Sequence, residues 1–319
     1  MSDEQAAAIW PAPQGFDAYG CYPPSQTEKF LTCPQLWDYE KRWEPIGIWQ
    51  PHALMGTALG AGLDLQRQCT QAGVPWVFSI LMDRVAQVIE KGWTEGGTDW
   101  TIEGVVGMCE KVLKKAVKTD VLRGGTVLGV QIPLGPQNPA WKHSNAAGDT
   151  PAHSIADLIV KLPDGSVMIH DDKFHFRVNP DYLQDRLAEA ETLWQLWDYA
   201  WRWDTFHGAN EKGEPGTAKV SLLQKHVMVL NPQVRSETYP VTVTPGRLAM
   251  WKQSAFIHWQ RMHAIEHQLL NPGRNYLSCR KPWRCSFYAA CHDLEGKEAT
   301  FGALYRLKDG QEPKDNCPF

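Results

Sequence analysis

Residues 154–174 constrain the fold most strongly, because they have the sequence of a β-hairpin. Two apolar runs, SIADLIVKL and SVMIHDDKF, flank a Pro-Asp-Gly turn sequence at 163–165. Turn residues between two short apolar runs are typical of a hairpin. If Leu162 pairs with Ser166 across a three-residue loop, the register of the whole hairpin is fixed.

This register places two carboxylates face to face. Asp157 lies directly opposite Asp171, and directly opposed residues have Cβ atoms about 4.5–5.5 Å apart. Because side chains alternate along a strand, Lys173 shares the face of Asp171, whereas Asp172 points away. Like charges this close require a cation, a proton on one of them, or a neutralising lysine. The hairpin alone leaves two interpretations: a Mg²⁺ or Mn²⁺ site that activates water against a phosphoryl group, and an ordinary hairpin with a solvated acidic face.

The rest of the chain predicts an α/β protein. A length of 319 residues favours two domains, or one large domain with an insertion. Residues 1–24 and the polar segment 135–153 are expected to be irregular. Apolar periodicity predicts helices over 25–43 (broken at Cys33-Pro34), 53–72, 76–91, 101–122, 181–203 and 246–269, and further strands over 126–135, 218–230 and 237–243.

The charge balance excludes a general attraction to polyanions. With 32 Lys+Arg against 36 Asp+Glu, the net charge is −4, so any binding of nucleic acid must come from a local basic face. One such face is a lysine stripe at helical spacing, which is either a solvated helix surface or a contact for phosphates. The stripe consists of Lys111, Lys114, Lys115 and Lys118.

No segment approaches the roughly 18 uncharged apolar residues of a membrane helix, and the N-terminal residues lack the pattern of a secretory signal. We therefore expect a cytoplasmic protein, whose eight cysteines should not default to disulfides. Three of them, Cys279, Cys285 and Cys291, are spaced C-x5-C-x5-C. This spacing is wide for zinc, whereas an iron–sulfur cluster is larger and tolerates it.

The cysteine set needs a fourth ligand. Cys33 is the best candidate, because the Cys-Pro break leaves its side chain at a helix terminus. His292 is the alternative and would favour zinc. A third interpretation is that the thiols are buried and unrelated.

Four features occur in the order found in a family of nucleases. They are a Cys-Pro pair in TCPQLWDYEKRW, the glycine-rich segment MGTALGAGLDL, Asp157 ahead of Asp171-x-Lys173, and a Gln-x-x-x-Tyr motif from Gln195 to Tyr199 ahead of the cysteines. On these features, which span residues 25–292, the chain resembles the RecB-like branch of the PD-(D/E)XK nucleases, and specifically its iron–sulfur exonucleases.

The resemblance implies an α/β fold of the restriction-endonuclease type, with a mixed central sheet flanked by helices. It implies one nuclease domain over 25–292, between the irregular lead-in and a C-terminal tail at 293–319. Within that domain it places a helical insertion at 64–125, the catalytic sheet and site helix at 126–243, and the C-terminal helix with its cysteine loop at 246–292.

For the active site, the resemblance implies that Asp157, Asp171 and the main-chain carbonyl of Asp172 bind Mg²⁺ or Mn²⁺, with Lys173 as the catalytic lysine. It also gives a site-lining role to the amide and phenol of the Gln-x-x-x-Tyr motif. Without the resemblance, Gln195 and Tyr199 would be incidental polar groups one turn apart on a half-buried helix face.

The resemblance further implies a structural 4Fe-4S cluster that joins the two ends of the domain. Its ligands would be Cys33, Cys279, Cys285 and Cys291.

The implied activity is metal-dependent hydrolysis of DNA, often exonucleolytic and from single-stranded ends, in recombination, repair or CRISPR-type adaptation. Other recombination or adaptation proteins would be partners, and phage genomes carry many short members of the family. The DNA backbone would contact the lysine stripe and a second basic group, which consists of Arg274, Arg280, Lys281 and Arg284.

Two features depart from the family. The family usually has a metal-binding His four residues after a glycine in the glycine-rich helix, and counting from Gly56 this position is Gly60. His52 and Asp64 are the nearest alternatives. The x5 cysteine spacing also exceeds the commoner x2 form.

These departures keep two other hypotheses open. One is a catalytically impaired nuclease-fold protein that binds DNA or a recombination partner without cutting. The other is a zinc-stabilised protein with no role in nucleic-acid metabolism.

Overall fold

The computed structural model describes residues 22, 24–45, 51–93, 100–134, 142–143, 150–151, 154–178, 194–204, 219–266, 269–273, 287, 291 and 305–308. The chain divides into two compact units, and each combines segments that are distant in the sequence. The first unit contains residues 1–48, 136–152 and 249–319, and the second contains residues 49–135 and 153–248.

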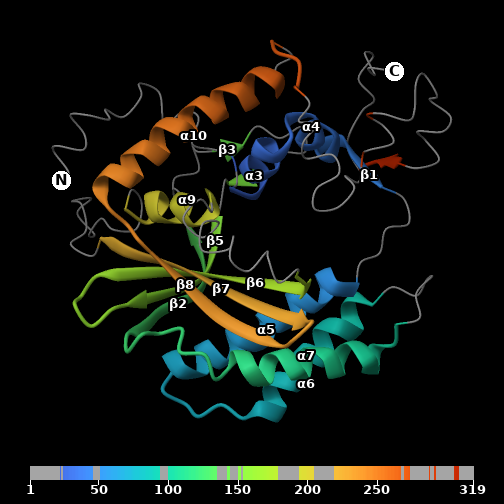
Figure 1. Cartoon of the computed structure of the whole chain (residues 1–319), viewed down its shortest axis with the longest axis vertical. Helices are drawn as coiled ribbons and strands as arrows, with labels where there is room; N and C mark the ends of the chain where they lie inside the picture. The colour runs from blue at the N-terminus through green and yellow to red at the C-terminus, as the bar shows by residue number, and fades with distance from the viewer. Residues whose placement is uncertain are drawn as a thin grey trace. The chain divides into compact units, whose positions relative to one another are not determined.

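The second unit is built on a five-stranded mixed sheet, in agreement with the predicted α/β class (Figure 1). Its strand order is β2-β5-β6-β7-β8. Only β6 and β7 are parallel, and the other neighbours are antiparallel. The strands are β2 (Thr126–Leu134), β5 (Ser154–Lys161), β6 (Val167–Arg177), β7 (Val220–Asn231) and β8 (Arg235–Thr242).

The predicted hairpin is β5–β6, and its predicted register is confirmed. The N–H of Leu162 donates to the carbonyl of Ser166 over 2.8 Å, and the ladder continues to the pair Leu158–His170. Gly165 closes the turn at φ 85°, a left-handed conformation that glycine adopts without steric cost.

Among the described residues of the second unit, α5 (Pro51–Gln71) and α7 (Ile102–Ala116) lie against one face of this sheet with α6 (Phe78–Gly92) packed on both, and α9 (Trp194–Arg202) lies against the other face (Figure 1). The apolar stripes of α5, α6 and α7 bury a common core against side chains from β6 and β7, such as Phe174 and Met228. The three tryptophans of α9, Trp194, Trp197 and Trp201, are buried as predicted.

The end of α7 corrects the predicted helix over 101–122. The helix stops at Ala116, and Asp120 then accepts hydrogen bonds from the N–H groups of Leu122 and Arg123. Such a side-chain turn competes with helical hydrogen bonding. Lys118 therefore lies beyond the helix, although all four lysines of the stripe are exposed. The predicted helix over 181–203 is described only from Trp194 onward.

The first unit contains the predicted break at Cys33. Helix α3 (Pro24–Thr32) ends before it and α4 (Pro34–Arg42) begins after it. Cys33 is extended, with φ −162°, and Pro34 occupies the first helical turn. Most of α10 (Pro245–Glu266) belongs to this unit, and the indole of Trp259 on α10 donates to the Thr27 hydroxyl of α3 over 3.1 Å.

Short strand pairs complete the first unit. β1 (Trp43–Pro45) pairs antiparallel with β9 (Tyr305–Leu307). β3 (Lys142–His143) pairs with β4 (Thr150–Pro151) inside the segment predicted to be irregular. Among the described helices, none has the length and apolar character that a membrane crossing requires.

Candidate active site

The candidate site lies where the pairing of β5 and β6 ends. The last paired residues are Leu158 and His170, so Asp157 occupies the point at which the two strands separate. One oxygen of Asp157 accepts the main-chain N–H of Asp172 over 2.7 Å, and the other accepts the Gln131 side-chain amide over 3.2 Å. Asp157 is thereby attached to both neighbouring strands.

On the α9 side of the sheet, four of the predicted catalytic side chains form one connected chain. The Lys173 ammonium lies 2.9 Å from an Asp171 carboxylate oxygen and donates to the Gln195 amide oxygen over 2.7 Å. The Gln195 amide group donates in turn to the Tyr199 hydroxyl. The structure therefore brings Asp171, Lys173, Gln195 and Tyr199 together, with Asp157 close enough to interact with Asp171 electrostatically.

A buried hydrogen bond joins α9 to β5 at this position. Asp198 of α9 accepts the hydroxyl of Ser154, the first residue of β5, over 2.9 Å. Arg202, one turn later on α9, lies 2.6 Å from the same carboxylate, and both charged groups are fully buried. The ion pair compensates the buried charge of Asp198, and the Ser154 contact holds the helix that presents Gln195 and Tyr199 against β5.

The site carries more negative charge than its protein surroundings compensate. Burial raises the pKa of Asp157 to about 7, and repulsion from Asp171 and Asp172 contributes to the rise. Burial, followed by the charge of Asp171, also raises the pKa of the Tyr199 hydroxyl. A cation at this point would relieve the repulsion between these groups.

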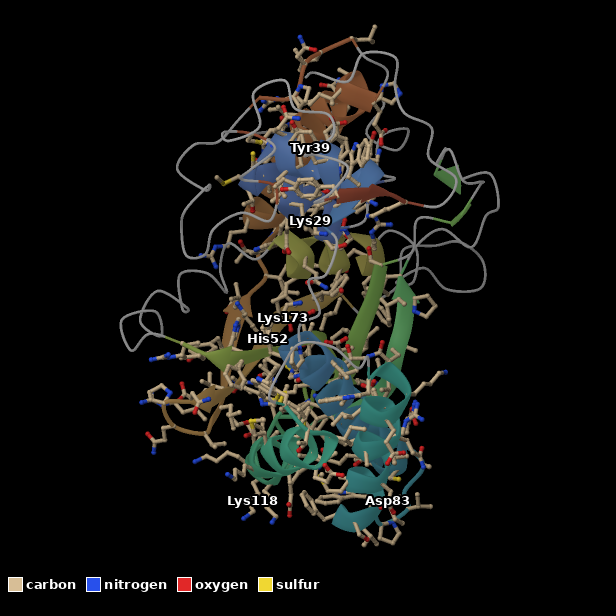
Figure 2. The ribbon with its side chains drawn as sticks, turned by 90° about the vertical axis from the view of Figure 1, so that its right-hand side faces the viewer. Lys29, Tyr39, His52, Asp83, Lys118 and Lys173 are labelled. Carbon is tan, nitrogen blue, oxygen red and sulfur yellow. The ribbon has the colours of Figure 1, made fainter. Side chains whose placement is uncertain are left out.

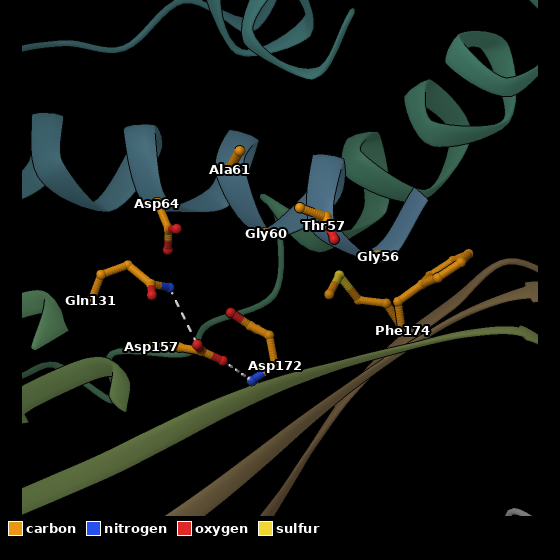
Figure 3. Close-up of a pocket in the computed structure, with 10 residues that line it drawn as sticks. Gly56, Thr57, Gly60, Ala61, Asp64, Gln131, Asp157, Asp172 and Phe174 are labelled. Atoms are coloured by element: carbon orange, nitrogen blue, oxygen red, sulfur yellow. Dashed lines mark hydrogen bonds between the residues drawn. The ribbon is translucent and has the colours of Figure 1, made fainter. Parts of the chain in front are cut away.

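A pocket of about 390 Å³ opens between α5 and the sheet beside Asp157 (Figure 3). An added Cβ at Gly60 would have no atom within 4 Å, so the position at which the resemblance expects His is open space. The pocket is lined by Gly56, Thr57, Gly60, Ala61, Asp64, Gln131, Asp157, Asp172, Phe174 and Met228.

Asp64 points from α5 into this pocket toward Gln131 and Asp157 (Figure 3). One of its oxygens is buried and has no hydrogen-bond partner among the described residues. Burial raises the pKa of Asp64 to about 6, although Arg67 and Gln131 oppose the rise. Of the two alternatives to a histidine at Gly60, only Asp64 lines the pocket, because His52 instead lies against the ring of Phe176.

The side chain of Asp172 points to the opposite face from Lys173, as the hairpin register predicts, and enters a buried cluster. Its carboxylate receives Arg67 of α5 at 2.5 and 3.0 Å, His170 of β6 at 3.0 Å and His226 of β7 at 2.6 Å. Burial alone would raise the pKa of Asp172, but Arg67 and His170 hold it well below its usual range. No pattern in the sequence had indicated Arg67, His170 or His226 as site residues.

Two histidines and a carboxylate within 4.8 Å of one another are donors that a metal ion could use, but Arg67 already supplies the cation here. Its guanidinium contacts both oxygens of Asp172. The amide of Gln224 donates to Nδ1 of His170, because its oxygen accepts from Arg123. The Nε2 atom of His170 lies 3.0 Å from Asp172 and 3.1 Å from the Arg67 guanidinium, and burial lowers the pKa of the ring to about 4.

The predicted DNA contacts are described only in part. The lysine stripe is exposed on the helical layer of the second unit, and Lys118 projects into solvent (Figure 2). Lys114 pairs with Glu110 at 2.5 Å, one turn earlier on α7. The second basic group, Arg274, Arg280, Lys281 and Arg284, lies outside the described residues.

Two of the four proposed cluster cysteines are described, and both belong to the first unit. Cys33 is buried at the start of α4. Cys291 packs against a small core that includes Tyr39 of α4, which stacks on Phe287 at 5.4 Å. Cys279, Cys285 and the alternative ligand His292 lie outside the described residues.

Comparisons with known proteins do not assign a family. No protein-family model and no curated protein matches this chain. A solved structure described as "Putative exonuclease" from Eubacterium rectale is similar over 83% of this chain and 88% of that one, with a TM-score of 0.44 and 12% identity. A structure of the protein SSO0001 is similar over 74% of this chain and 84% of that one, with a TM-score of 0.26 and 10% identity. Likenesses at these scores carry no functional argument, so the function is inferred from the site.

Proposed function

We propose that this protein is a metal-dependent deoxyribonuclease that hydrolyses phosphodiester bonds, as an exonuclease on single-stranded DNA ends. The observation that carries the proposal is the convergence of Asp157, Asp171 and Lys173 at the open end of the β5–β6 hairpin. Two carboxylates and a lysine are groups that suit metal-assisted phosphodiester hydrolysis, and Asp157 also lines the pocket.

The residues at this point fit a hard divalent cation. Asp157, Asp171 and the main-chain carbonyl of Asp172 would bind Mg²⁺ or Mn²⁺, which prefer oxygen donors. Asp64 would add a carboxylate from α5, since one of its buried oxygens has no hydrogen-bond partner among the described residues. The bound metal would polarise the phosphoryl group and lower the pKa of a water molecule.

The lysine and the α9 side chains would act on the phosphate rather than on the metal. Asp171 and Gln195 fix the Lys173 ammonium from two sides. From this position the ammonium would stabilise negative charge that develops on the phosphoryl oxygens, or orient the attacking water. Tyr199 holds Gln195 in place and is a positioning residue. The exposed lysine stripe, which begins on α7 and ends just after it, would contact the DNA backbone.

The test is cleavage of end-labelled single-stranded DNA with Mn²⁺ by wild type, Asp171→Asn and Lys173→Ala. We expect each variant to lose at least about 100-fold in rate, the usual scale for removing an electrostatic or acid–base group. Lys91→Ala, at an exposed position in the last turn of α6 and outside both the site and the lysine stripe, is the control and should retain cleavage. Undiminished cleavage by Asp171→Asn would refute the assignment of the active site.

One observation favours a second candidate function, DNA binding without cleavage. Gly60 leaves open the place where the resemblance expects a metal-binding His. If the natural protein is impaired for this reason, Gly60→His should gain Mn²⁺-dependent cleavage that Gly60→Ala does not gain. If wild type already cleaves and Gly60→His adds less than a twofold change, the second candidate is rejected.

We also propose a 4Fe-4S cluster on Cys33, Cys279, Cys285 and Cys291 in the first unit. The proposal is supported by the placement of the two described thiols, one at the start of α4 and the other against the aromatic core that α4 helps to form. The expected role of the cluster is structural.

A further inference from the structure

We propose that the buried cluster of Arg67, His170, Asp172 and His226 is a positioning device for the metal-binding carboxylate Asp157. The inference rests on the proposed function and extends it to residues on the far face of the sheet. Asp172 is the connection, because its main chain reaches Asp157 while its side chain belongs to the cluster.

The main-chain contact orients the Asp157 carboxylate. Pairing with β2 on either side, at Ala156 and Leu158, places the main chain of Asp157. Its carboxylate is held by two donors, the N–H of Asp172 over 2.7 Å and the Gln131 amide over 3.2 Å. The closer of the two is the Asp172 N–H, so the orientation of the carboxylate depends on that peptide group.

Side-chain contacts add to the β6–β7 pairing in holding that peptide group. Three donors from α5, β6 and β7 converge on the Asp172 carboxylate, at distances from 2.5 to 3.0 Å. A carboxylate bonded from three elements cannot change rotamer without breaking several buried hydrogen bonds, each of them costly to leave unmade. The cluster thus holds the side chain of Asp172 on one face of the sheet, while the main-chain N–H of Asp172 contacts Asp157.

Further hydrogen bonds support the donors themselves. His226 contacts the Ser236 hydroxyl over 2.8 Å, and Ser236 contacts the Thr119 hydroxyl over 2.6 Å. His170 accepts from Gln224, which also donates to the main chain at Val121. The orientation of Asp172 is consequently set by β7, β8 and the turn after α7.

A stabilising role alone does not account for this arrangement. Replacing both partners of a buried ion pair by apolar side chains is often neutral or stabilising, so apolar residues in place of both Arg67 and Asp172 would serve packing equally well. A carboxylate held by three donors adds geometric specificity, and groups that orient metal ligands typically change metal affinity by about 10–100-fold when they are mutated.

The test measures Mn²⁺ binding by the loss of the electron paramagnetic resonance signal of free Mn²⁺, without DNA or turnover. Asp172→Asn removes the charge that pairs with Arg67, and His226→Leu removes one donor and leaves the Arg67–Asp172 pair in place. We expect Mn²⁺ affinity to fall about 10–100-fold in Asp172→Asn and about tenfold in His226→Leu.

Thr101→Ala is the matched control. It deletes the N-cap of α7, where the Thr101 hydroxyl accepts the Gly104 N–H over 3.1 Å, and so destabilises the same unit without touching Asp172. Each protein is measured at the same interval below its own unfolding midpoint, and the control should bind Mn²⁺ as wild type does.

The outcomes separate the two proposals. Wild type that binds no Mn²⁺ would overturn the proposed function and the positioning role with it. Wild type that binds Mn²⁺, with His226→Leu unchanged, would overturn the positioning role alone. If Asp172→Asn fails to fold, His226→Leu decides.

Discussion

Among single residues, Asp157 is the one whose proposed role and surroundings favour different charge states. The proposed chemistry needs its carboxylate charged, whereas burial and the neighbouring aspartates raise its pKa to about 7. In an unfolded chain the carboxyl group titrates near about 3.9. The folded protein therefore binds this proton more tightly. The stability that the proton contributes is complete below about pH 4 and is lost as the pH rises through about 7.

The loss of this stability at high pH leads to a prediction for the metal-free protein. Asp157→Asn removes the titrating group, so it should raise the free energy of unfolding relative to wild type by about 1–3 kcal/mol at pH 8 and give no such gain at pH 4. Urea denaturation at the two pH values measures the difference. Asp83→Asn, at an exposed position on α6 (Figure 2), is the surface control. An equal change in the free energy of unfolding at both pH values would show that the effect of Asp157→Asn does not come from titration of this carboxyl group.

Which site residues could be predicted depends on the length of chain that separates them. Asp157 and Asp171 belong to one hairpin, whose short turn fixes their register. Asp172 contacts His226 because β6 pairs with β7 in parallel. Arg67 reaches the same carboxylate from α5. No periodicity within a segment encodes such contacts, so this cluster was not predicted.

Among the secondary-structure elements, α5 contains two glycines, Gly60 and Gly62, that lie in different surroundings. The glycine-rich segment predicts close helix packing in general, but an added Cβ at Gly62 would lie 3.0 Å from Val85 and 3.4 Å from Leu113, whereas Gly60 faces the open pocket. Packing of α5 against α6 and α7 therefore requires Gly62 specifically.

The two positions form a matched pair of substitutions. Gly60→Ala should stabilise the protein by up to about 1 kcal/mol through helix propensity. Gly62→Ala receives the same benefit, but overpacking costs about 1–3 kcal/mol, so it should be the less stable of the two. Urea midpoints of both variants test this order. Equal midpoints would show that the helices separate without cost, contrary to the packing seen here.

For the whole molecule, the chain length favours two domains or one domain with an insertion, but the segments that make up each unit were not evident from the sequence. The first unit joins the N-terminal helices to residues 136–152 and 249–319. Local patterns predicted α3, α4 and α10 separately, because a break at Cys33 and a helical period are local properties. They did not predict that these elements pack together through Trp259 and Thr27.

The proposed iron–sulfur cluster would give this discontinuous unit a covalent closure. A cluster bound by Cys33 and by cysteines near residue 285 would close a loop of well over 200 residues, and closure of long loops removes conformational entropy from the unfolded chain. The second unit has its own core and its own candidate site. Loss of the cluster should therefore affect the two units unequally.

Cys33→Ala tests this expectation. Protein purified without oxygen should contain about four iron and four sulfide per chain, and Cys33→Ala should lose most of both. Its first unit should unfold at a lower temperature while Mn²⁺ binding by the second unit persists. Cys109→Ala is the control, because this thiol is buried in the core of the second unit and should leave the iron content unchanged. Full iron content in Cys33→Ala would exclude Cys33 as a ligand, and zinc without sulfide in wild type would instead support the alternative site with His292.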